Sequence, residues 1–145
     1  MLKRTLGKSN LEVSALGMGC WAIGGPWTWA QPGREPYPAG WGNTDDEESI
    51  RAIHAALDMG VNFFDTAANY GAGHSEGVLG QALKGKRDKV VIATKFGHIV
   101  NEKEKTVYGD AAQIIKNVRM DVENSLRRLQ TDVIDIYQMH DATYD

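Results

Sequence analysis

Three short apolar runs in this sequence end in side chains that can gain or lose a proton. Val61–Asp65 ends in a carboxylate, Val90–Lys95 in an amine and Val133–His140 in an imidazole, and Tyr70 follows the first run by five residues. Side chains alternate along a strand, and the carboxyl ends of parallel strands form the open face of an α/β fold. If the runs are neighbouring parallel strands, these four side chains converge. Such a cluster could position and transfer protons.

Each of the four residues also has an ordinary structural explanation when it is taken singly. Asp65 could begin a turn or a helix, and Lys95 could extend its charged end into solvent. Tyr70 could pack in a loop, and a single histidine at a strand end, such as His140, is more often structural than catalytic. The occurrence of all four in register favours one shared site over four separate roles.

The runs lie within a regular alternation of strand and helix patterns. Leu2–Leu6 and Leu11–Val13 predict a hairpin, and Ala15–Met18 predicts a short buried strand that precedes the three runs. Helices are predicted between the later strands: from a capping box at Thr44–Glu47 to Met59, over Ser75–Leu83, and from a cap at Asp110 to Leu129. In the capping box, Thr44 is the expected N-cap.

Four strands that alternate with three helices predict consecutive βα units with a parallel sheet. Such a series fits part of an α/β barrel or an open doubly wound sheet. No Gly-x-Gly-x-x-Gly motif follows any strand, which disfavours a dinucleotide-binding doubly wound domain. The 145 residues fall short of the roughly 250 of a complete barrel. We therefore expect one domain, residues 1–145, with the fold of a (β/α)8 TIM-type half-barrel.

The segment from Cys20 to Asn43 is expected to form a long loop without extended regular structure. It contains all four tryptophans and all four prolines of the chain. Because it follows the first strand of the predicted sheet, it should lie on the same face as the titratable residues. Its tryptophans could line a wall above a substrate or pack the loop against the barrel, and the sequence leaves both readings open. The later segment Asn101–Lys105 is expected to be a solvated loop.

Composition and charge exclude several classes of function. The net charge of −3, without a dense basic stretch, argues against a nucleic-acid partner. No apolar run approaches the roughly 20 residues of a membrane span, and no signal peptide follows Met1, so we expect a cytoplasmic protein. No metal is expected, because Cys20, His54 and His98 fit no ligand spacing. The adjacent residues His74, Ser75 and Glu76 predict a helix start rather than a catalytic triad.

The sequence around the titratable residues resembles the aldo-keto reductase family. The resemblance rests on motifs that occur in order along nearly the whole chain: Leu6–Ser14 and Leu16–Gly19 at the N-terminus, Phe63–Gly71 (FFDTAANYG), Ala93–Gly97 (ATKFG) and Tyr137–His140 (YQMH). Any single motif is weak. Together, each at the expected strand end, they are specific.

The resemblance implies that Asp65, Tyr70, Lys95 and His140 form a catalytic tetrad that reduces an aldehyde or ketone with NADPH. Tyr70 would protonate the carbonyl oxygen, a task for which a free phenol is a poor acid at neutral pH. Lys95 would favour release of that proton, Asp65 would hold Lys95, and a neutral His140 would orient the substrate. Cys20, Trp21 and Asp65 are the residues expected near the nicotinamide.

The resemblance also implies that the chain is the N-terminal half of a barrel. In this family, most contacts to the adenosine and phosphates come from the second half, so residues 1–145 alone should not bind NADPH tightly. Open sheet edges would favour self-association. Two alternatives to an enzyme therefore stay open: a non-catalytic binding or regulatory subunit built on the same barrel, and an inactive half-barrel fragment.

Overall fold

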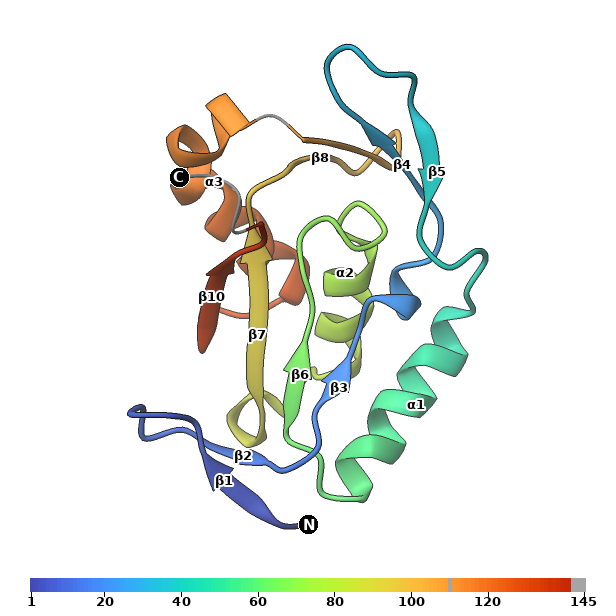
Figure 1. Cartoon of the computed structure of the whole chain (residues 1–145). Helices are drawn as coiled ribbons and strands as arrows, with labels where there is room; N and C mark the ends of the chain where they lie inside the picture. Colours follow the sequence, from blue (N-terminus) through green and yellow to red (C-terminus); the bar gives the residue numbers. More distant parts are fainter. Residues whose placement is uncertain (110, 142–145) are drawn as a thin grey trace.

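A parallel sheet of four strands forms the centre of the computed structural model, which describes residues 1–109 and 111–141 and only the backbone of residues 111–116. The strands are β3 (Met18–Gly19), β6 (Phe63–Asp65), β7 (Val91–Phe96) and β10 (Ile136–Met139), and neighbours in the sheet follow one another in this order (Figure 1). The connecting helices are α1 (Asp46–Asp58), α2 (His74–Ala82) and α3 (Ala111–Leu129). The predicted cap Asp110 lies outside the described residues.

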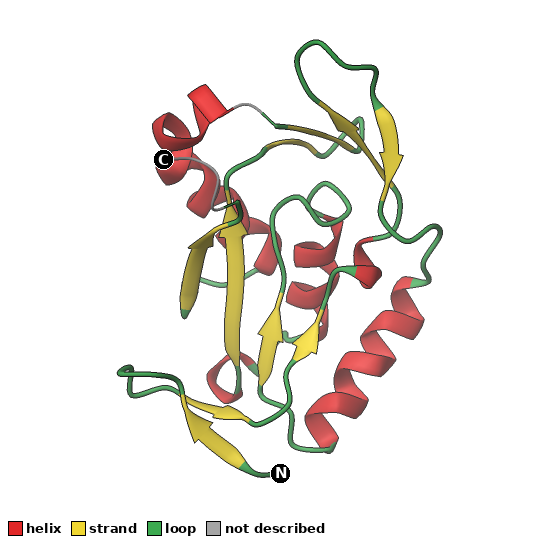
Figure 2. Ribbon diagram, in the orientation of Figure 1, coloured by secondary structure: helices red, strands yellow, loops and turns green. Residues whose placement is uncertain are grey.

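All three helices contribute to one hydrophobic core against one face of this sheet. The core contains Ile53 of α1, Leu79 of α2 and Leu129 of α3, together with Phe64 and Ile92 of the strands. A doubly wound sheet reverses its strand order and carries helices on both faces. Here the order runs in one direction and the helices share one core, which is the arrangement of a barrel wall (Figure 2). Among the described residues, no helix is both long and apolar enough to cross a membrane.

The predicted N-terminal hairpin is confirmed. Strands β1 (Lys3–Thr5) and β2 (Glu12–Ser14) pair antiparallel at the amino-terminal end of the central sheet. Asn62 fastens the hairpin to the sheet, because its side-chain oxygen accepts a hydrogen bond from the Ser14 N–H at 2.6 Å, and its own N–H donates to Ser14 Oγ at 3.0 Å. The hairpin thereby covers the end of the sheet opposite the titratable residues.

Several predicted boundaries are wrong. The strands expected at 61–65 and 133–140 are confined to Phe63–Asp65 and Ile136–Met139. The strand expected at Ala15–Met18 is confined to Met18–Gly19, because the Ser14 hydroxyl donates to the Leu16 carbonyl at 2.7 Å and bends the chain, leaving Leu16 exposed. Helix α1 takes Asp45 as its N-cap and not Thr44. The Asp45 carboxylate accepts from the Glu48 N–H at 2.9 Å, which shifts the helix start by one residue.

The prediction that Cys20–Asn43 lacks regular structure is also wrong. It contains a 3-10 turn (Ala22–Gly24) and strands β4 (Trp27–Ala30) and β5 (Tyr37–Ala39). These strands join β8 (Ile99–Asn101) and β9 (Thr106–Tyr108) in a second sheet, ordered β5-β4-β9-β8, that we call the capping sheet. The loop predicted at Asn101–Lys105 is confirmed for residues 102–105, which form the turn between β8 and β9, whereas Asn101 is the last residue of β8. Pro38 is tolerated because β5 is an edge strand, where one N–H can be missing.

The loop after β6 packs against the 3-10 turn with no space for a side chain. A Cβ at Gly71, whose φ is +63°, would lie 1.9 Å from the carbonyl oxygen of Gly24. The Tyr70 carbonyl also accepts from the Ser75 N–H at 3.2 Å, so both sides of this loop are tied down. This close backbone contact fixes the position of Tyr70.

A buried ion pair joins the helices on the outer face of the sheet. Arg128 of α3 donates from Nε to Glu76 of α2 at 2.6 Å, and the Glu76 side chain is fully buried. The second oxygen of Glu76 accepts from the Thr94 hydroxyl of β7 at 2.5 Å. The carboxylate therefore links two helices to the strand that carries Lys95. A short 3-10 turn at Arg87–Lys89 precedes that strand.

We predict that Glu76→Gln lowers the free energy of unfolding by roughly 1–3 kcal/mol, because buried Arg128 loses its fully buried counter-ion and keeps only Glu102, whose side chain is 43% exposed. Chemical denaturation followed by circular dichroism measures the change. Glu48→Gln is the control, since it removes a similar ion pair with Arg51 that is exposed to solvent, and it should leave stability unchanged. Equal effects of the two substitutions would contradict the role given to Glu76.

We further predict that Gly71→Ala is strongly destabilising and Gly7→Ala only mildly so. Both glycines have positive φ, but a Cβ at Gly7 would meet no atom within 4 Å, whereas one at Gly71 collides with backbone. The conformational cost alone is about 1 kcal/mol, so the difference between the variants reports the collision. Thermal unfolding of both variants tests this, and similar melting temperatures would refute the tight contact.

Candidate active site

The register of the central sheet brings Lys95 next to Asp65. Asp65 pairs with Ala93 on β7, so Lys95 lies two residues farther along and its side chain reaches back toward the end of β6. Its Nζ donates to Asp65 Oδ1 at 2.6 Å and to the Thr66 carbonyl at 2.9 Å. Only 16% of the Lys95 side chain is exposed. The pair therefore has a fixed geometry and little freedom to rotate into solvent.

Tyr70 lies on the other side of the same ammonium group. Lys95 Nζ is 3.4 Å from the Tyr70 hydroxyl oxygen and 5.1 Å from the ring centroid. The Trp21 ring packs beside the phenol, with 6.1 Å between centroids. The contacts that the sequence led us to expect among Asp65, Lys95 and Tyr70 are thus present, with the phenol hydroxyl next to a positive charge.

His140 follows β10 and completes the cluster. Its backbone N–H donates to the Phe96 carbonyl at 2.9 Å, and its ring meets Tyr70 edge-on with 5.6 Å between centroids. Burial lowers the pKa of His140 to about 4, and the charges of His98 and Lys95 add to this decrease. His140 is therefore uncharged at neutral pH. Its Nδ1 is buried without a hydrogen-bond partner among the described residues.

His98 is a residue of this cluster that the sequence reasoning missed. It is buried, and its ring lies 5.2 Å from that of His140 and 4.9 Å from that of Trp29. Its Nε2 is hydrogen-bonded to Asp141 Oδ2 at 3.0 Å. The available signal was its place in the loop just after Lys95, since that loop belongs to the open face of the sheet.

The three residues expected near a nicotinamide occupy different environments. The Asp65 side chain is 39% exposed, and Trp21 is 46% exposed and stacked edge-on against Trp41. Cys20 is fully buried, and this burial raises the pKa of its thiol to about 12. Of the three, only Trp21 and Asp65 present side-chain atoms that a ligand could touch.

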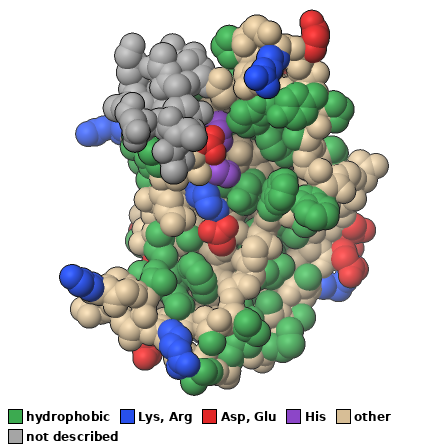
Figure 3. All heavy atoms as spheres, in the orientation of Figure 1, with side chains coloured by type: hydrophobic (Ala, Val, Ile, Leu, Met, Phe, Trp, Pro, Cys, Tyr) green, Lys and Arg blue, Asp and Glu red, His purple; other side chains and the backbone are tan. Residues whose placement is uncertain are grey.

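The tryptophans divide between the two roles that the sequence left open. Trp21 and Trp41 are exposed beside Tyr70, where they could form a wall above a ligand. Trp27 and Trp29 belong to the capping sheet and pack with Val107 and with each other. Figure 3 shows hydrophobic side chains beside the histidines and an adjacent basic and acidic pair on this face.

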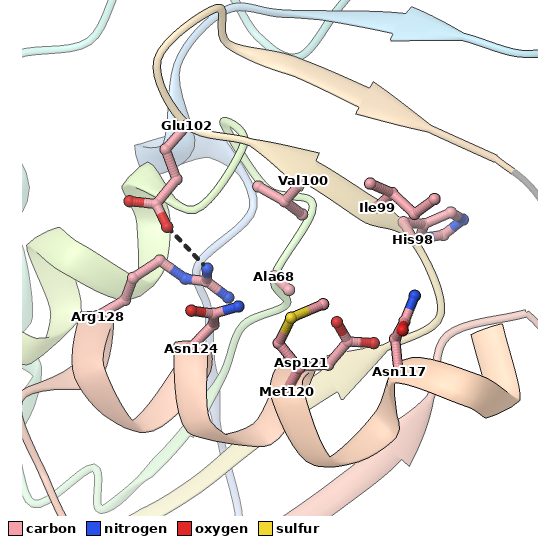
Figure 4. A pocket seen from close by; sticks show the side chains of 10 residues that line it. All are labelled: Ala68, His98, Ile99, Val100, Glu102, Asn117, Met120, Asp121, Asn124 and Arg128. Atoms are coloured by element: carbon pink, nitrogen blue, oxygen red, sulfur yellow. Dashed lines mark hydrogen bonds and ion pairs between the residues drawn. The ribbon is translucent and has the colours of Figure 1, made fainter. Parts of the chain in front are cut away.

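An open hollow of about 450 Å³ lies between the N-terminal hairpin and the strands β3 and β6, and Asp65 is the member of the cluster that borders it. It is lined by Asp65, Phe63 and Met18 and extends to Arg4 of the N-terminal hairpin. A separate cavity of about 80 Å³ lies between α3 and β8, where Asn117, Asp121 and Asn124 face Val100 and the Glu102–Arg128 ion pair closes one end (Figure 4). The hollow, which Asp65 borders, is the space next to the candidate site.

The remaining candidate groups have structural roles. Ser75 donates to the Cys20 carbonyl at 2.6 Å, and Glu76 forms the buried ion pair. His74 contacts the Gly24 carbonyl and Asp46. Within residues 1–109 and 117–141, no group of three or more His, Cys, Asp or Glu side chains is arranged to hold a metal ion.

Comparison with known proteins identifies the family. The Aldo/keto reductase family model matches residues 15–145. The chain is 41% identical to the aldo-keto reductase YhdN of Bacillus subtilis over 138 residues, which is 94% of this chain and 37% of that protein. It is 38% identical to the NADH-specific methylglyoxal reductase of Escherichia coli, covering 97% of this chain and 42% of that one.

A solved structure shares the fold. The aldo-keto reductase from Klebsiella pneumoniae, in complex with NADPH, superposes with a TM-score of 0.65 at 30% identity, over 97% of this chain and 40% of that one. The chain thus spans about two fifths of the length of these relatives, and the predicted half of a TIM-type barrel is confirmed. The chain belongs to the aldo-keto reductase family.

Proposed function

We propose that the chain provides the catalytic half of an oxidoreductase that reduces an aldehyde or ketone with NADPH. The observation that carries this proposal is the position of Lys95 Nζ, which contacts the Asp65 carboxylate and the Tyr70 hydroxyl at once. A structural lysine at a strand end needs only one such partner. A phenol next to a fixed ammonium is suited to give up its proton.

Each member of the tetrad has a distinct task in this proposal. A bound nicotinamide would supply the hydride for the carbonyl carbon. Tyr70 donates its hydroxyl proton to the carbonyl oxygen as negative charge develops there, and Lys95 stabilises the phenolate that is left. Asp65 holds the Lys95 ammonium in place next to the phenol. His140, uncharged, donates a hydrogen bond to the same oxygen and so fixes the carbonyl in front of Tyr70.

The residues fit the nicotinamide end of the cofactor better than its phosphates. Trp21 and Asp65 present exposed side chains, and Asp65 borders the open hollow, which offers space for a flat ring. Among the described residues that line the hollow, Arg4 is the sole cation. We therefore propose that a complementary second half, in the same polypeptide or in another chain, binds the phosphates. NADH remains the competing cofactor, since the E. coli relative is named as NADH-specific.

The two alternatives to an enzyme differ from it in measurable ways. A regulatory subunit would bind the nicotinamide cofactor without turnover, and an isolated structural half would do neither. The contact between Lys95 and Tyr70 favours catalysis, because a binding role does not require a phenol next to an ammonium. Self-association through the edges of β3 and β10 would be the way for two copies to complete each other.

We predict that the 145-residue chain alone has negligible carbonyl reductase activity, and that fusion to the second half of YhdN restores it. Hydride transfer requires the nicotinamide to be held close to the carbonyl carbon. The assay is consumption of NADPH, and separately of NADH, with a small aldehyde. Robust turnover by the chain alone would contradict the need for a second half, and light scattering would then reveal whether a dimer is responsible.

We predict that Tyr70→Phe in the fused protein lowers kcat about 100- to 10,000-fold, the usual contribution of a general acid. Cofactor affinity, measured by fluorescence quenching, should change little. Tyr37→Phe is the matched control, because this exposed tyrosine of β5 lies in the capping sheet and should leave kcat intact. An active Tyr70→Phe variant would rule out Tyr70 as the proton donor.

A further inference from the structure

His98 is buried between the capping sheet and the candidate active site. Its ring meets His140 at an interplanar angle of 68° with 5.2 Å between centroids, and it meets Trp29 edge-on on another side. Only 6% of the residue is exposed. The ring of His98 therefore forms part of the surface against which His140 rests.

The Asp141 carboxylate fixes the state of the His98 ring. A carboxylate only accepts hydrogen bonds, so the 3.0 Å contact between His98 Nε2 and Asp141 Oδ2 requires the His98 proton on Nε2. The Asp141 side chain is 40% exposed, whereas that of His98 is 3% exposed. The carboxylate thus holds the imidazole from the solvent side and offers it a counter-charge.

Two imidazoles at this separation do not both accept a proton easily. The charged or titratable groups that face His140 are His98, Lys95, Tyr70, Asp65 and Asp141. Among them, Asp141 is bonded to His98, and Asp65 is bonded to Lys95. The first proton that enters the pair is therefore stabilised on His98, and the resulting positive charge opposes a second proton on His140.

We propose that His98, held by Asp141, is a positioning residue with two effects: it supports the ring of His140 against Tyr70, and it keeps His140 uncharged by taking up a proton first. The significance of that form rests on the proposed function, in which His140 donates to a carbonyl oxygen. The arrangement itself does not depend on turnover and can be tested without cofactor or substrate.

The order of protonation gives the test. Burial lowers the pKa of His98 below its usual 6.5, but Asp141 opposes the decrease, whereas the pKa of His140 falls to about 4. Heteronuclear NMR of the 145-residue chain resolves the ring signals of its four histidines as pH is lowered. We expect His98 to titrate before His140.

Two variants test the coupling. Asp141→Asn should move the midpoint of His98 down, because it removes the counter-charge of that ring. His98→Phe, which keeps an aromatic ring in place, should raise the His140 midpoint by about half a pH unit or more. His54→Gln is the control, since His54 contacts the Ala82 carbonyl in the helical layer and should leave His140 unchanged. If His98→Phe does not fold, Asp141→Asn, at a partly exposed position, is decisive.

The proposal is overturned if His140 titrates first in the unaltered chain, if the His98 midpoint is the same in Asp141→Asn, or if the His140 midpoint is the same in His98→Phe. Neither result would affect the assignment of Tyr70, which the activity of the fused protein tests independently. Conversely, an inactive fused protein with the expected titrations would leave the positioning role of His98 intact and refute the reductase.

Discussion

The parallel register of β6, β7 and β10 is the constraint on which the candidate site depends. Asp65, the last residue of β6, pairs with Ala93, whereas the last residues of β7 and β10, Phe96 and Met139, pair with each other, so β6 ends before its two neighbours. This stagger gives Lys95 the reach to contact both Asp65 and Tyr70, and it places His140 one residue beyond the last ladder pair, beside the phenol. A slip of one residue in β7 would turn Lys95 toward the helices and Thr94 toward the hollow.

The outer face of β7 explains why such a slip is costly. Thr94 donates to Glu76, whose carboxylate is buried with Arg128. This polar network on the helix side of β7 forms only when Thr94 faces the helices, that is, in one register of the strand. If Lys95 took the position of Thr94, its ammonium group would be a second cation against the Glu76 carboxylate, which is already paired with Arg128. The buried ion pair is therefore better understood as a device that specifies register than as a source of net stability.

The sequence predicted the parts of the site that follow from local patterns. Strand ends, helix stripes and alternation sufficed to bring Asp65, Lys95 and His140 together, because these depend on elements adjacent in the chain. The capping sheet was missed because its central contact, β4 with β9, joins segments far apart in sequence. Trp27 and Trp29 do alternate as strand residues should, but the surrounding prolines obscured this. His98 was missed for the same reason, since its neighbours lie far from it in the sequence: Trp29 is in β4, and His140 and Asp141 follow β10.

The capping sheet gives the candidate site a property that the barrel strands alone would not. It is built from the segments that follow β3 and β7. The first segment carries Trp29 in β4, and in the second His98 directly precedes β8. Trp29 packs on His98, and His98 packs on His140, so a continuous series of ring contacts joins the capping sheet to the imidazole of His140. Sequence changes in β4 must therefore be compatible with the packing of His98 as well as with the capping sheet itself.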